Sequence, residues 1–523
     1  MPLSRLDQDA IRVGSKSLFQ YCDEHALERT LSQQDVYLDC QPELLSLDIR
    51  ERHLRLAELV TYLLGDGLLK VSRVRDQLCN AAGIESPTSF RPGTSQAISL
   101  CRALNLPIVF AGTLPPAKPS PVARLRQFRP VPKLMDFQQE VLQKASSSIR
   151  EERSCLISMP TGGGKTLVGT ILQKQWHSQQ DANSTSLWIA HTDELCAQAS
   201  SCIEQVWQSP TTSIETGTVV RAWGSSVNGL LKGIVYREGE ANHASSSHTV
   251  VVSTPQSALK MLRDQSHGSL QNALSKLGLL IVDEAHRAGA SSYRNLIAET
   301  ENRFSGIQLV GLSATPVRDS YSAQVYRGTE QLTQLFEQLI EPVETLAGDG
   351  TSVQQLQERG VLSNLDVKRM TNQSFDLKSR IREVAKIAAD TNRTGILFST
   401  SVSQAKLAAI YLREFGVSAD YVASDSTPAD RANLVEALRN GDIRVLANCE
   451  ILTTGFDAPI VTDIYLFRST QSLVLYKQMV GRGLRGPRFG GSDSCALYLC
   501  GVDLAFDPDP NTAKFARAVW SNS

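Results

Sequence analysis

A short apolar run, followed by a glycine-rich turn and a helix-period pattern, constrains this chain more than any other stretch. The run ends at Ser158, glycines occupy positions 162–164, and Lys165 and Thr166 open the helical pattern. Glycine permits main-chain angles that a Cβ forbids, so the backbone N–H groups of such a turn can converge on one anion. The stretch therefore predicts a phosphate-binding loop between a buried strand and a helix, which is typical of a parallel α/β sheet.

The residue types in this loop also suggest individual roles. Lys165 can reach the outer phosphates of a nucleotide, and the Thr166 hydroxyl can bind Mg²⁺. Met159 departs from the strict pattern, which has glycine at that position. The residues expected to surround the phosphates are Thr161, Gly162, Gly163, Gly164, Lys165 and Thr166.

Bulk composition is that of an ordinary multidomain globular protein. The 523 residues are too many for one core, and the net charge of -1 provides no global attraction for polyanions. No apolar run approaches the ~18 residues of a membrane span, and the amino-terminal segment lacks the apolar core of a signal peptide. Ten cysteines are scattered without a Cys-x-x-Cys pair, so we expect reduced packing residues. The resulting expectation is a cytoplasmic protein with no membrane partner.

Residues 1–113 predict a mainly helical domain of unassigned role. Apolar residues recur there with helical period, a glycine-containing break interrupts the pattern, and the period then resumes. The first set is Leu56, Leu59, Val60, Leu63 and Leu64, and the second is Leu68, Val71, Val74 and Leu78. Two interpretations fit: a structural helical hairpin, or a helix-turn-helix module that places Arg73 and Arg75 on DNA.

Beyond a proline-rich linker at 114–132, apolar runs of strand length alternate with helical segments. This alternation predicts an α/β fold with two tandem parallel-sheet domains, 133–345 and 346–523, and a hinge within 341–363. In the first domain, the expected strands are Cys155–Ser158, Leu187–Ala190, Thr249–Ser253, Leu279–Val282 and Gln308–Leu312. In the second, they are Thr394–Ser399, Ala419–Val422, Arg444–Asn448, Thr462–Phe467 and Ala496–Cys500.

Two adjacent carboxylates end one of the predicted strands. Asp283 and Glu284 follow the apolar pair Ile281 and Val282. In an ATPase with a phosphate-binding loop, the acid at the strand end holds magnesium and a neighbouring acid polarises the attacking water. We therefore predict that Asp283 binds the metal and that Glu284 is the catalytic carboxylate that polarises the water.

The phosphate loop and the sequence Asp283-Glu284-Ala285-His286 together resemble superfamily 2 helicases, and other motifs of that family follow in order. The resemblance implies two RecA-like domains that bind ATP and Mg²⁺. In the family, the motif matched by Gln138 reads the adenine, and the motif matched by Ser313, Ala314 and Thr315 couples nucleotide state to strand binding. The residues implied to contact nucleic acid are His191, Thr192, Ser253, Thr254, Thr453 and Thr454.

The second α/β domain carries the remaining motifs of the resemblance. Gly455 and Asp457 match the fifth motif, which implies contact with the nucleotide, and Gln478, Arg482 and Arg485 match the sixth. Because these arginines lie on a different domain from the phosphate loop, we predict that they reach the phosphates only when the domains close. ATP hydrolysis would then depend on domain closure.

The last two motifs also bear on the nucleic acid. Gly-Phe-Asp-Ala-Pro followed by Gly-Arg-Gly-Leu-Arg is more similar to the DNA-directed branch, which includes RadD-type bacterial repair helicases and the motor subunits of type I and type III restriction enzymes. We therefore expect a DNA helicase or a double-strand DNA translocase. The alternatives are an RNA-directed helicase, an ATP-gated clamp, and the motor subunit of a restriction or phage-defence complex docked to a protein partner through residues 1–113.

Overall fold

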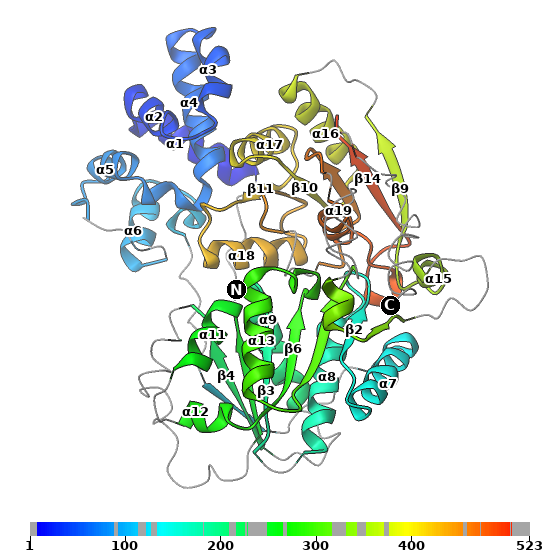
Figure 1. Ribbon diagram of the computed structural model, residues 1–523. Coiled ribbons are helices and arrows are strands. Elements are labelled where there is room, and N and C mark those ends of the chain that lie inside the picture. Colours follow the sequence, from blue (N-terminus) through cyan, green and yellow to red (C-terminus); the bar gives the residue numbers. More distant parts are fainter. Residues whose placement is uncertain are drawn as a thin grey trace. The chain divides into compact units, whose positions relative to one another are not determined.

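In this computed structural model the chain forms two compact units, and the helical domain shares a unit with the second α/β domain (Figure 1). Unit 1 comprises Met1–Ala117, Ser363–Ser469 and Arg482–Asp503, and unit 2 comprises Lys118–Leu362, Thr470–Gly481 and Leu504–Ser523. The structure describes residues 8–87, 91, 93–112, 122–126, 133–180, 183–208, 216–224, 227, 248–264, 269–315, 331–342, 352–370, 376–452, 458–470, 472–502 and 504.

Unit 2 is built on an eight-stranded sheet with the order β1-β4-β5-β3-β6-β7-β2-β8. Strand β1 pairs antiparallel with β4, and the other described pairings are parallel. The strands are β1 Val122–Arg126, β2 Cys155–Ser158, β3 Thr185–Ile189, β4 Thr216–Ala222, β5 His248–Ser253, β6 Leu277–Asp283, β7 Gln308–Ser313 and β8 Gln338–Ile340. The five strands predicted for this domain are all present, which confirms its parallel α/β class.

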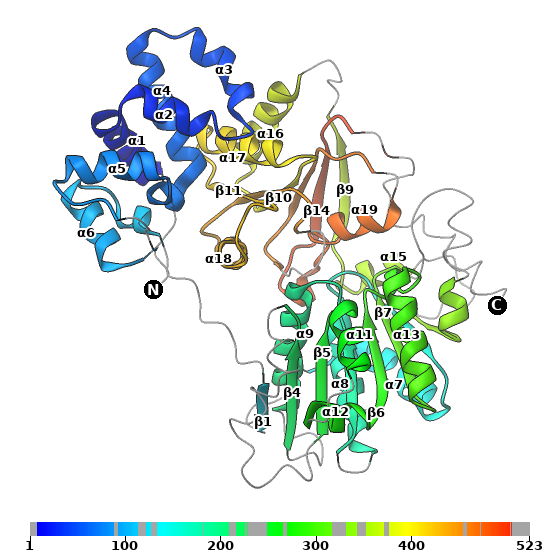
Figure 2. The same cartoon turned by 60° about the vertical axis from the view of Figure 1, so that its left-hand side comes forward.

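Helices cover both faces of this sheet (Figure 2). On one face α7 (Asp136–Arg150), α8 (Lys165–Ser178) and α9 (Asp193–Trp207) pack against one another. On the other face α11 (Pro255–Arg263) contacts both α12 (Ser269–Leu274) and α13 (Ser291–Arg303). Right-handed crossovers produce this division, because the chain moves one way across the sheet through α8 and α9 and back through α11 and α13. Strands covered on both faces are buried along their length, as all five residues of β3 are.

Unit 1 contains a second sheet, with the order β11-β12-β10-β13-β14-β9, and every described pairing in it is parallel. Its strands are β9 Asn364–Arg369, β10 Gly395–Phe398, β11 Ala419–Val422, β12 Val445–Asn448, β13 Asp463–Leu466 and β14 Ser494–Leu499. Helices α16 (Leu377–Thr391) and α17 (Val402–Glu414) pack together on one face. Helix α18 (Pro428–Arg439) follows β11, and α19 (Leu473–Val480), which clusters with unit 2, connects β13 to β14. The prediction of two parallel sheets is confirmed.

The amino-terminal domain is helical, as predicted. Its elements are α1 Gln8–Tyr21, α2 Glu24–Leu31, α3 Tyr37–Leu45, α4 Ile49–Leu64, η1 Gly65–Lys70, α5 Ser72–Ala81, α6 Ser95–Ala103 and η2 Ile108–Ala111. Helix α4 buries the predicted apolar face and ends at Gly65, whose φ of 51° is left-handed. Arg75, proposed for a DNA contact in the helix-turn-helix interpretation, is 7% exposed and donates from Nε to Ser86 Oγ at 3.4 Å. Its burial makes it a packing residue in this structure.

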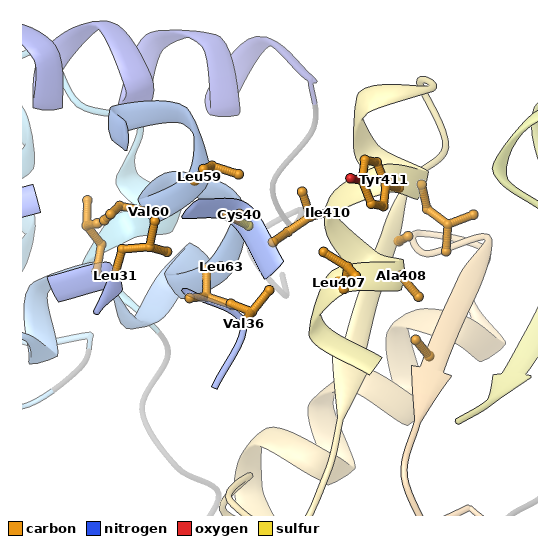
Figure 3. Close-up of a cluster of buried hydrophobic side chains, with 14 of the residues drawn as sticks. Leu31, Val36, Cys40, Leu59, Val60, Leu63, Leu407, Ala408, Ile410 and Tyr411 are labelled. Atoms are coloured by element: carbon orange, nitrogen blue, oxygen red, sulfur yellow. The ribbon is translucent and has the colours of Figure 1, made fainter. Parts of the chain in front are cut away.

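Helix α4 packs on α17, so the helical domain and the second α/β domain share one hydrophobic core (Figure 3). In Figure 3, Leu407 and Ile410 of α17 face the side of the helical domain that carries Val36, Cys40 and Leu63. All five side chains are buried. A buried apolar seam of this kind stabilises two domains as one body more than polar surface contacts do.

Hydrogen bonds and ion pairs also join the helical domain to the second α/β domain. Arg55 of α4 pairs with Glu414 of α17, and Arg413 donates to the carbonyl of Tyr62. The buried Lys406 ammonium lies 2.8 Å from Asp425 of the α/β domain and 3.9 Å from Asp35 of the helical domain. Buried charges need such partners, because an unpaired ion in the interior is costly.

Some elements fall where the sequence had predicted connections. The proline-rich linker contains β1, which extends the first sheet through its antiparallel pairing with β4. The predicted hinge contains α15 (Ser352–Glu358), and residues 343–351 within it lie outside the described residues. Strands β4, β8 and β9 were not predicted. No helix in the described part of the chain has the length and apolarity needed to cross a membrane.

Candidate functional site

The predicted site residues of unit 2 meet at the carboxyl edge of its sheet. In the parallel register, Val282 of β6 lies opposite Ile189 of β3 and opposite Gly311 of β7, and Ser158 of β2 lies opposite Ser313 of β7. The strands therefore end together, and the segments that follow β2, β3, β6 and β7 are neighbours. In open parallel α/β sheets, ligands bind at this edge.

The phosphate loop has the backbone that its glycines predict. Gly162 and Gly164 have φ values of 85° and 86°, a left-handed region that favours glycine, and α8 begins directly afterwards at Lys165. Lys165 Nζ lies 3.4 Å from the carbonyl oxygen of Met159. Met159 itself is buried, and its N–H donates to the Ser313 carbonyl at 3.0 Å. Its φ is not left-handed, so a side chain is tolerated where the strict pattern has glycine.

Gln138 is close to this loop but is engaged by the backbone. Its Nε2 donates to the Gly163 carbonyl at 2.8 Å, and its Oε1 accepts from the Met135 N–H at 2.9 Å. The second bond is part of a capping box at the start of α7. The side chain is 2% exposed, so in this structure it braces the loop. The adenine contact stays a prediction.

The acidic pair at the end of β6 is buried. Asp283 is 4% exposed and Glu284 is 8% exposed. Burial, and next the charge of Glu284, raise the pKa of Asp283 to about 7, whereas Lys165 and the Glu284 N–H act in the opposite direction. The N–H of Glu284 donates to Asp283 Oδ1 at 2.9 Å. A carboxylate in this environment gains most from a cation placed beside it.

Glu284 is linked through His286 to Ser313, the last residue of β7. Its φ and ψ of 51° and 49° are left-handed, which is uncommon for a residue with a side chain and is found at functional sites. His286 Nδ1 lies 3.2 Å from Glu284 Oε2 and 3.2 Å from Ser313 Oγ. The Ser313 hydroxyl donates to the Thr315 carbonyl at 2.7 Å and accepts from the Thr315 N–H at 3.1 Å. Ala314 lies between them and is partly exposed.

The loops predicted to contact nucleic acid follow β3 and β5. The Thr192 hydroxyl caps α9 by accepting from the Leu195 N–H at 3.3 Å, and the Thr254 hydroxyl caps α11 by accepting from the Ser257 N–H at 3.4 Å. Ser253 is fully buried and donates to the Ala222 carbonyl at 2.7 Å, so its side chain is not accessible to a ligand. The predicted contact through this side chain is not supported.

His191 is exposed, and its contact with Arg287 was missed from the sequence. Arg287 Nη1 lies 3.1 Å from His191 Nε2. Burial, followed by Arg287 and His286, lowers the pKa of His191. The contact depends on the register between β3 and β6 and on the short helix η3 (Ala285–Arg287) after β6, and neither has a sequence signature.

The residues of the sixth motif are divided between the two units. Gln478 lies in α19 and is buried, and a Cβ at Gly481 would lie 2.7 Å from Thr161 Cβ, so the end of α19 closely approaches the phosphate loop within unit 2. Arg482 and Arg485 belong to unit 1 and are 7% and 9% exposed.

The backbone around the two arginines is anchored to the second sheet. The Arg485 carbonyl accepts from Ser363 Oγ at 2.7 Å and from the Ser492 N–H at 3.1 Å. Thr453, Thr454, Gly455 and Asp457 lie outside the described residues.

The residues of unit 2 fit a nucleoside triphosphate with a divalent cation. The left-handed glycines 162 and 164 shape the loop, Lys165 supplies a positive charge, and the buried Asp283 supplies an oxygen ligand of the kind that Mg²⁺ prefers. The Gly163 N–H donates to the Pro160 carbonyl at 2.9 Å in this structure. The Thr166 hydroxyl, one residue after Lys165, is the second predicted ligand.

Two family profiles match the chain. The profile described as Type III restriction enzyme, res subunit, matches residues 132–318, and the profile described as Helicase conserved C-terminal domain matches residues 379–486. The first match contains strands β2 to β7 and the second contains β10 to β13, and residues 1–131, 319–378 and 487–523 are outside both matches.

A relative and two solved structures illustrate the similarity. The putative ATP-dependent helicase IRC3 of Saccharomyces cerevisiae is 26% identical over 399 residues, which are 68% of this chain and 50% of the relative. The ATP-dependent Type ISP restriction-modification enzyme LlaBIII, solved bound to DNA, has a TM-score of 0.53 at 17% identity and covers 75% of this chain and 29% of that one. The DEAD-box helicase Mss116, solved with ssRNA and UDP-BeF, has a TM-score of 0.50 at 17% identity over 71% of each chain. The structural likeness shows the fold, and the chain spans about half the length of the curated relatives it matches.

Proposed function

We propose that the chain is a superfamily 2 helicase, a nucleic-acid-dependent ATPase that acts as a DNA helicase or double-strand DNA translocase. One observation carries the proposal: a buried pair of acids at a strand end lies beside the lysine of a glycine-rich phosphate loop. That combination is suited to hydrolysing a nucleoside triphosphate.

In this proposal the residues of unit 2 bind ATP and prepare it for attack. The N–H groups of Thr161–Thr166 hold the phosphates, and Lys165 neutralises their charge. Asp283 and Thr166 hold Mg²⁺, which when bound would neutralise the charge on the phosphate oxygens. Glu284 accepts the proton of the attacking water, and the neighbouring His286 holds its carboxylate in place.

Unit 1 contributes the positive charges that complete the site. We assign Arg482 and Arg485 to the charge that develops on the transferred phosphoryl group, with Gln478 beside them and Gly455 and Asp457 in contact with the nucleotide. Because the arginines and the phosphate loop belong to different units, hydrolysis would require the two units to close. Opening and closing would move the nucleic-acid contacts of the two units relative to each other.

We propose contact with the nucleic-acid backbone rather than with bases. The net charge of -1 gives the chain no overall attraction to a polyanion, so the proposed contacts are local. His191, the helix-capping Thr192 and Thr254, and Thr453 and Thr454 are the proposed contacts. The preference for DNA rests on the resemblance of the fifth and sixth motifs to the DNA-directed branch and on the restriction-enzyme profile that matches unit 2.

The test is steady-state ATP turnover of the full chain against single-stranded DNA, duplex DNA, forked DNA and RNA, with strand displacement and translocation measured in parallel. DNA is expected to raise turnover at least about tenfold, within the usual range of allosteric coupling. Stimulation by RNA alone would overturn the preference for DNA. Stimulation without movement along DNA would indicate an ATP-gated clamp.

A second candidate is the motor subunit of a larger restriction or phage-defence machine. The match to a restriction-enzyme subunit favours it, as does an exposed apolar surface on the helical domain. Leu38 and Leu45, seven residues apart on α3, are 74% and 68% exposed, and Ile49 at the start of α4 is 71% exposed. Co-expression with a nuclease encoded beside this protein tests it: a stable complex lost in Leu38→Ser would support the candidate, and separate elution would contradict it.

A further inference from the structure

The sheet of unit 2 has a border between its two sets of predicted functional loops. In the order β5-β3-β6-β7-β2, the loops after β5 and β3 carry the proposed nucleic-acid contacts. The acidic pair lies at the end of β6, Ser313 ends β7, and the phosphate loop follows β2. Strands β3 and β6 are the neighbours at the border, and their register places Ile189 opposite Val282. Any signal between nucleic acid and ATP within this unit must cross there.

Arg287 makes a side-chain contact across this border. It is the last residue of η3, after β6, and its Nη1 lies 3.1 Å from Nε2 of His191, which precedes α9. The guanidinium of Arg287 is partly buried, whereas His191 is exposed. His191 can therefore contact a ligand in solvent, while Arg287 lies in the turn that follows β6 and the acidic pair.

The chemistry of the pair fixes the state of the histidine. A guanidinium carries only hydrogen-bond donors, so the imidazole nitrogen that faces it must accept. Nε2 of His191 is then unprotonated, and the proton of the neutral ring lies on Nδ1. A neutral Nδ1–H is a donor suited to a phosphate oxygen. Loss of the arginine would release the ring to the other tautomer and to other rotamers.

Arg287 is also tied closely to the acid that we assign to catalysis. Its N–H donates to the Glu284 carbonyl at 2.9 Å within the single turn of η3. His286, in the same turn, lies 3.2 Å from both Glu284 Oε2 and Ser313 Oγ. Because Glu284 has a left-handed backbone held by this turn, a shift of Arg287 would be transmitted to the Glu284 carboxylate.

We propose that Arg287 is a positioning residue that couples nucleic-acid binding at His191 to the orientation of Glu284. This inference rests on the proposed function and deepens it. A phosphate bound at His191 would fix the ring, the ring would fix Arg287, and the η3 turn would then hold Glu284 in its productive orientation. Arg287 itself is not assigned a contact with ATP or with the reacting water.

The test compares ATP turnover of the full chain with and without a saturating linear DNA duplex. The variants are Arg287→Ala, Arg287→Lys, His191→Ala, the double alanine variant, and Arg294→Ala, an exposed arginine of α13 that serves as the matched control. Arg287→Ala is expected to lower the stimulation by DNA about tenfold, while the KM for ATP changes less than about twofold. Arg287→Lys should recover part of the stimulation, since an ammonium also donates to the imidazole but lacks the planar fork.

The double variant gives the decisive comparison, because residues that act through one contact are not additive. The double variant should lose no more stimulation by DNA than the single variant that has the larger loss. The inference would be overturned if the loss of stimulation in the double variant equalled the product of the two single losses. It would also be overturned if the loss in Arg287→Ala were explained by weaker ATP binding or by a lower unfolding temperature. Wild-type stimulation in Arg287→Ala would overturn it as well. If no nucleic acid stimulates the unmodified chain, the proposed function fails and the inference fails with it; if DNA stimulates both proteins equally, only the inference fails.

Discussion

Helices α8 and α17 each follow a strand that has a parallel neighbour on both sides, yet their surroundings differ. The first turn of α8, from Lys165 to Leu167, is partly exposed at the sheet edge, where a ligand can reach it. In α17, the ten residues from Gln404 to Arg413 are all buried, because the second sheet covers one side and the helical domain covers the other. The same α/β architecture thus exposes the proposed nucleotide site in one unit and carries an additional domain in the other.

This difference identifies the domains that share one core. Residues 1–112 precede the first α/β domain in the sequence, but their core is continuous with that of the second. A closing motion of the proposed motor would therefore carry the helical domain with the second sheet. A partner bound to the helical domain would then move with it in each ATP cycle.

The largest expected effect concerns the charges of unit 1. Arg485→Ala should lower DNA-stimulated ATP turnover by about 10³–10⁵-fold, as expected for an arginine that stabilises phosphoryl transfer, and leave ATP affinity nearly unchanged. Arg488→Ala is the control, since Arg488 is exposed three residues later and should keep wild-type turnover. Turnover above one tenth of wild type in Arg485→Ala would mean that unit 2 is sufficient for catalysis.

A second prediction addresses the shared core of unit 1. Leu407→Ala removes a buried side chain of α17 and should lower the free energy of unfolding of this unit by about 2–5 kcal/mol. Hydrogen exchange should then accelerate in both α17 and α4, whereas strands of unit 2 keep their protection. Leu54→Ala, at a position of α4 that is 40% exposed, should change stability by less than about 1 kcal/mol. Faster exchange in α17 with full protection in α4 would show that the helical domain is held independently.

The third prediction concerns the backbone of the phosphate loop. Gly164→Ala places a Cβ at a left-handed φ of 86° and against Gln138 Nε2. The backbone strain alone should cost about 1–2 kcal/mol, and the distorted loop should bind ATP roughly tenfold more weakly. Gly67→Ala in η1 is the control, because nothing but Lys70 Cδ at 3.9 Å would meet the added Cβ. Equal ATP affinity in wild type and Gly164→Ala, measured by calorimetry, would contradict the role of this loop.

The smallest effect is a difference in pH dependence between the units. Burial, followed by His248, lowers the pKa of His177 far below its ordinary value, and burial also lowers the pKa of His248. A histidine held neutral stabilises the fold above its unfolded pKa, and this stability is lost as pH falls below about 6.5. Unit 2 should therefore lose hydrogen-exchange protection between pH 6.5 and 5 by up to about 1.4 kcal/mol per pH unit for each proton taken up. An unchanged profile in His177→Gln would show that this buried ring is not responsible.

Local signals in the sequence predicted much of the fold. Strand β2, the left-handed glycines and the acidic end of β6 are each specified within a few residues, so they were found with nearly correct bounds. Strand β9 was missed because it is an edge strand in which Asp366 and Lys368 alternate with apolar residues beside a predicted hinge. The docking of α17 was not predictable, because Lys406 and Arg413 look like surface residues until Asp35, Asp420 and the Tyr62 carbonyl are brought to them.

The site was predicted less completely than the fold. Residue types identified the acids and the lysine, but the engagement of Gln138 with the Gly163 carbonyl and the burial of Ser253 depend on tertiary packing. The pairing of Arg287 with His191 depends on strand register, which no short motif encodes.

The most direct test of the central claim is ATP turnover by the full chain and by Glu284→Gln, each measured with and without duplex DNA. We predict that DNA raises wild-type turnover about tenfold or more, and that Glu284→Gln loses about 10²–10⁴-fold while still binding ATP, because a general base is removed and the phosphate loop is intact. Glu299→Gln, an exposed acid of α13, should behave as wild type. Wild-type turnover in Glu284→Gln, or turnover of the unmodified protein that DNA leaves unchanged, would contradict the account.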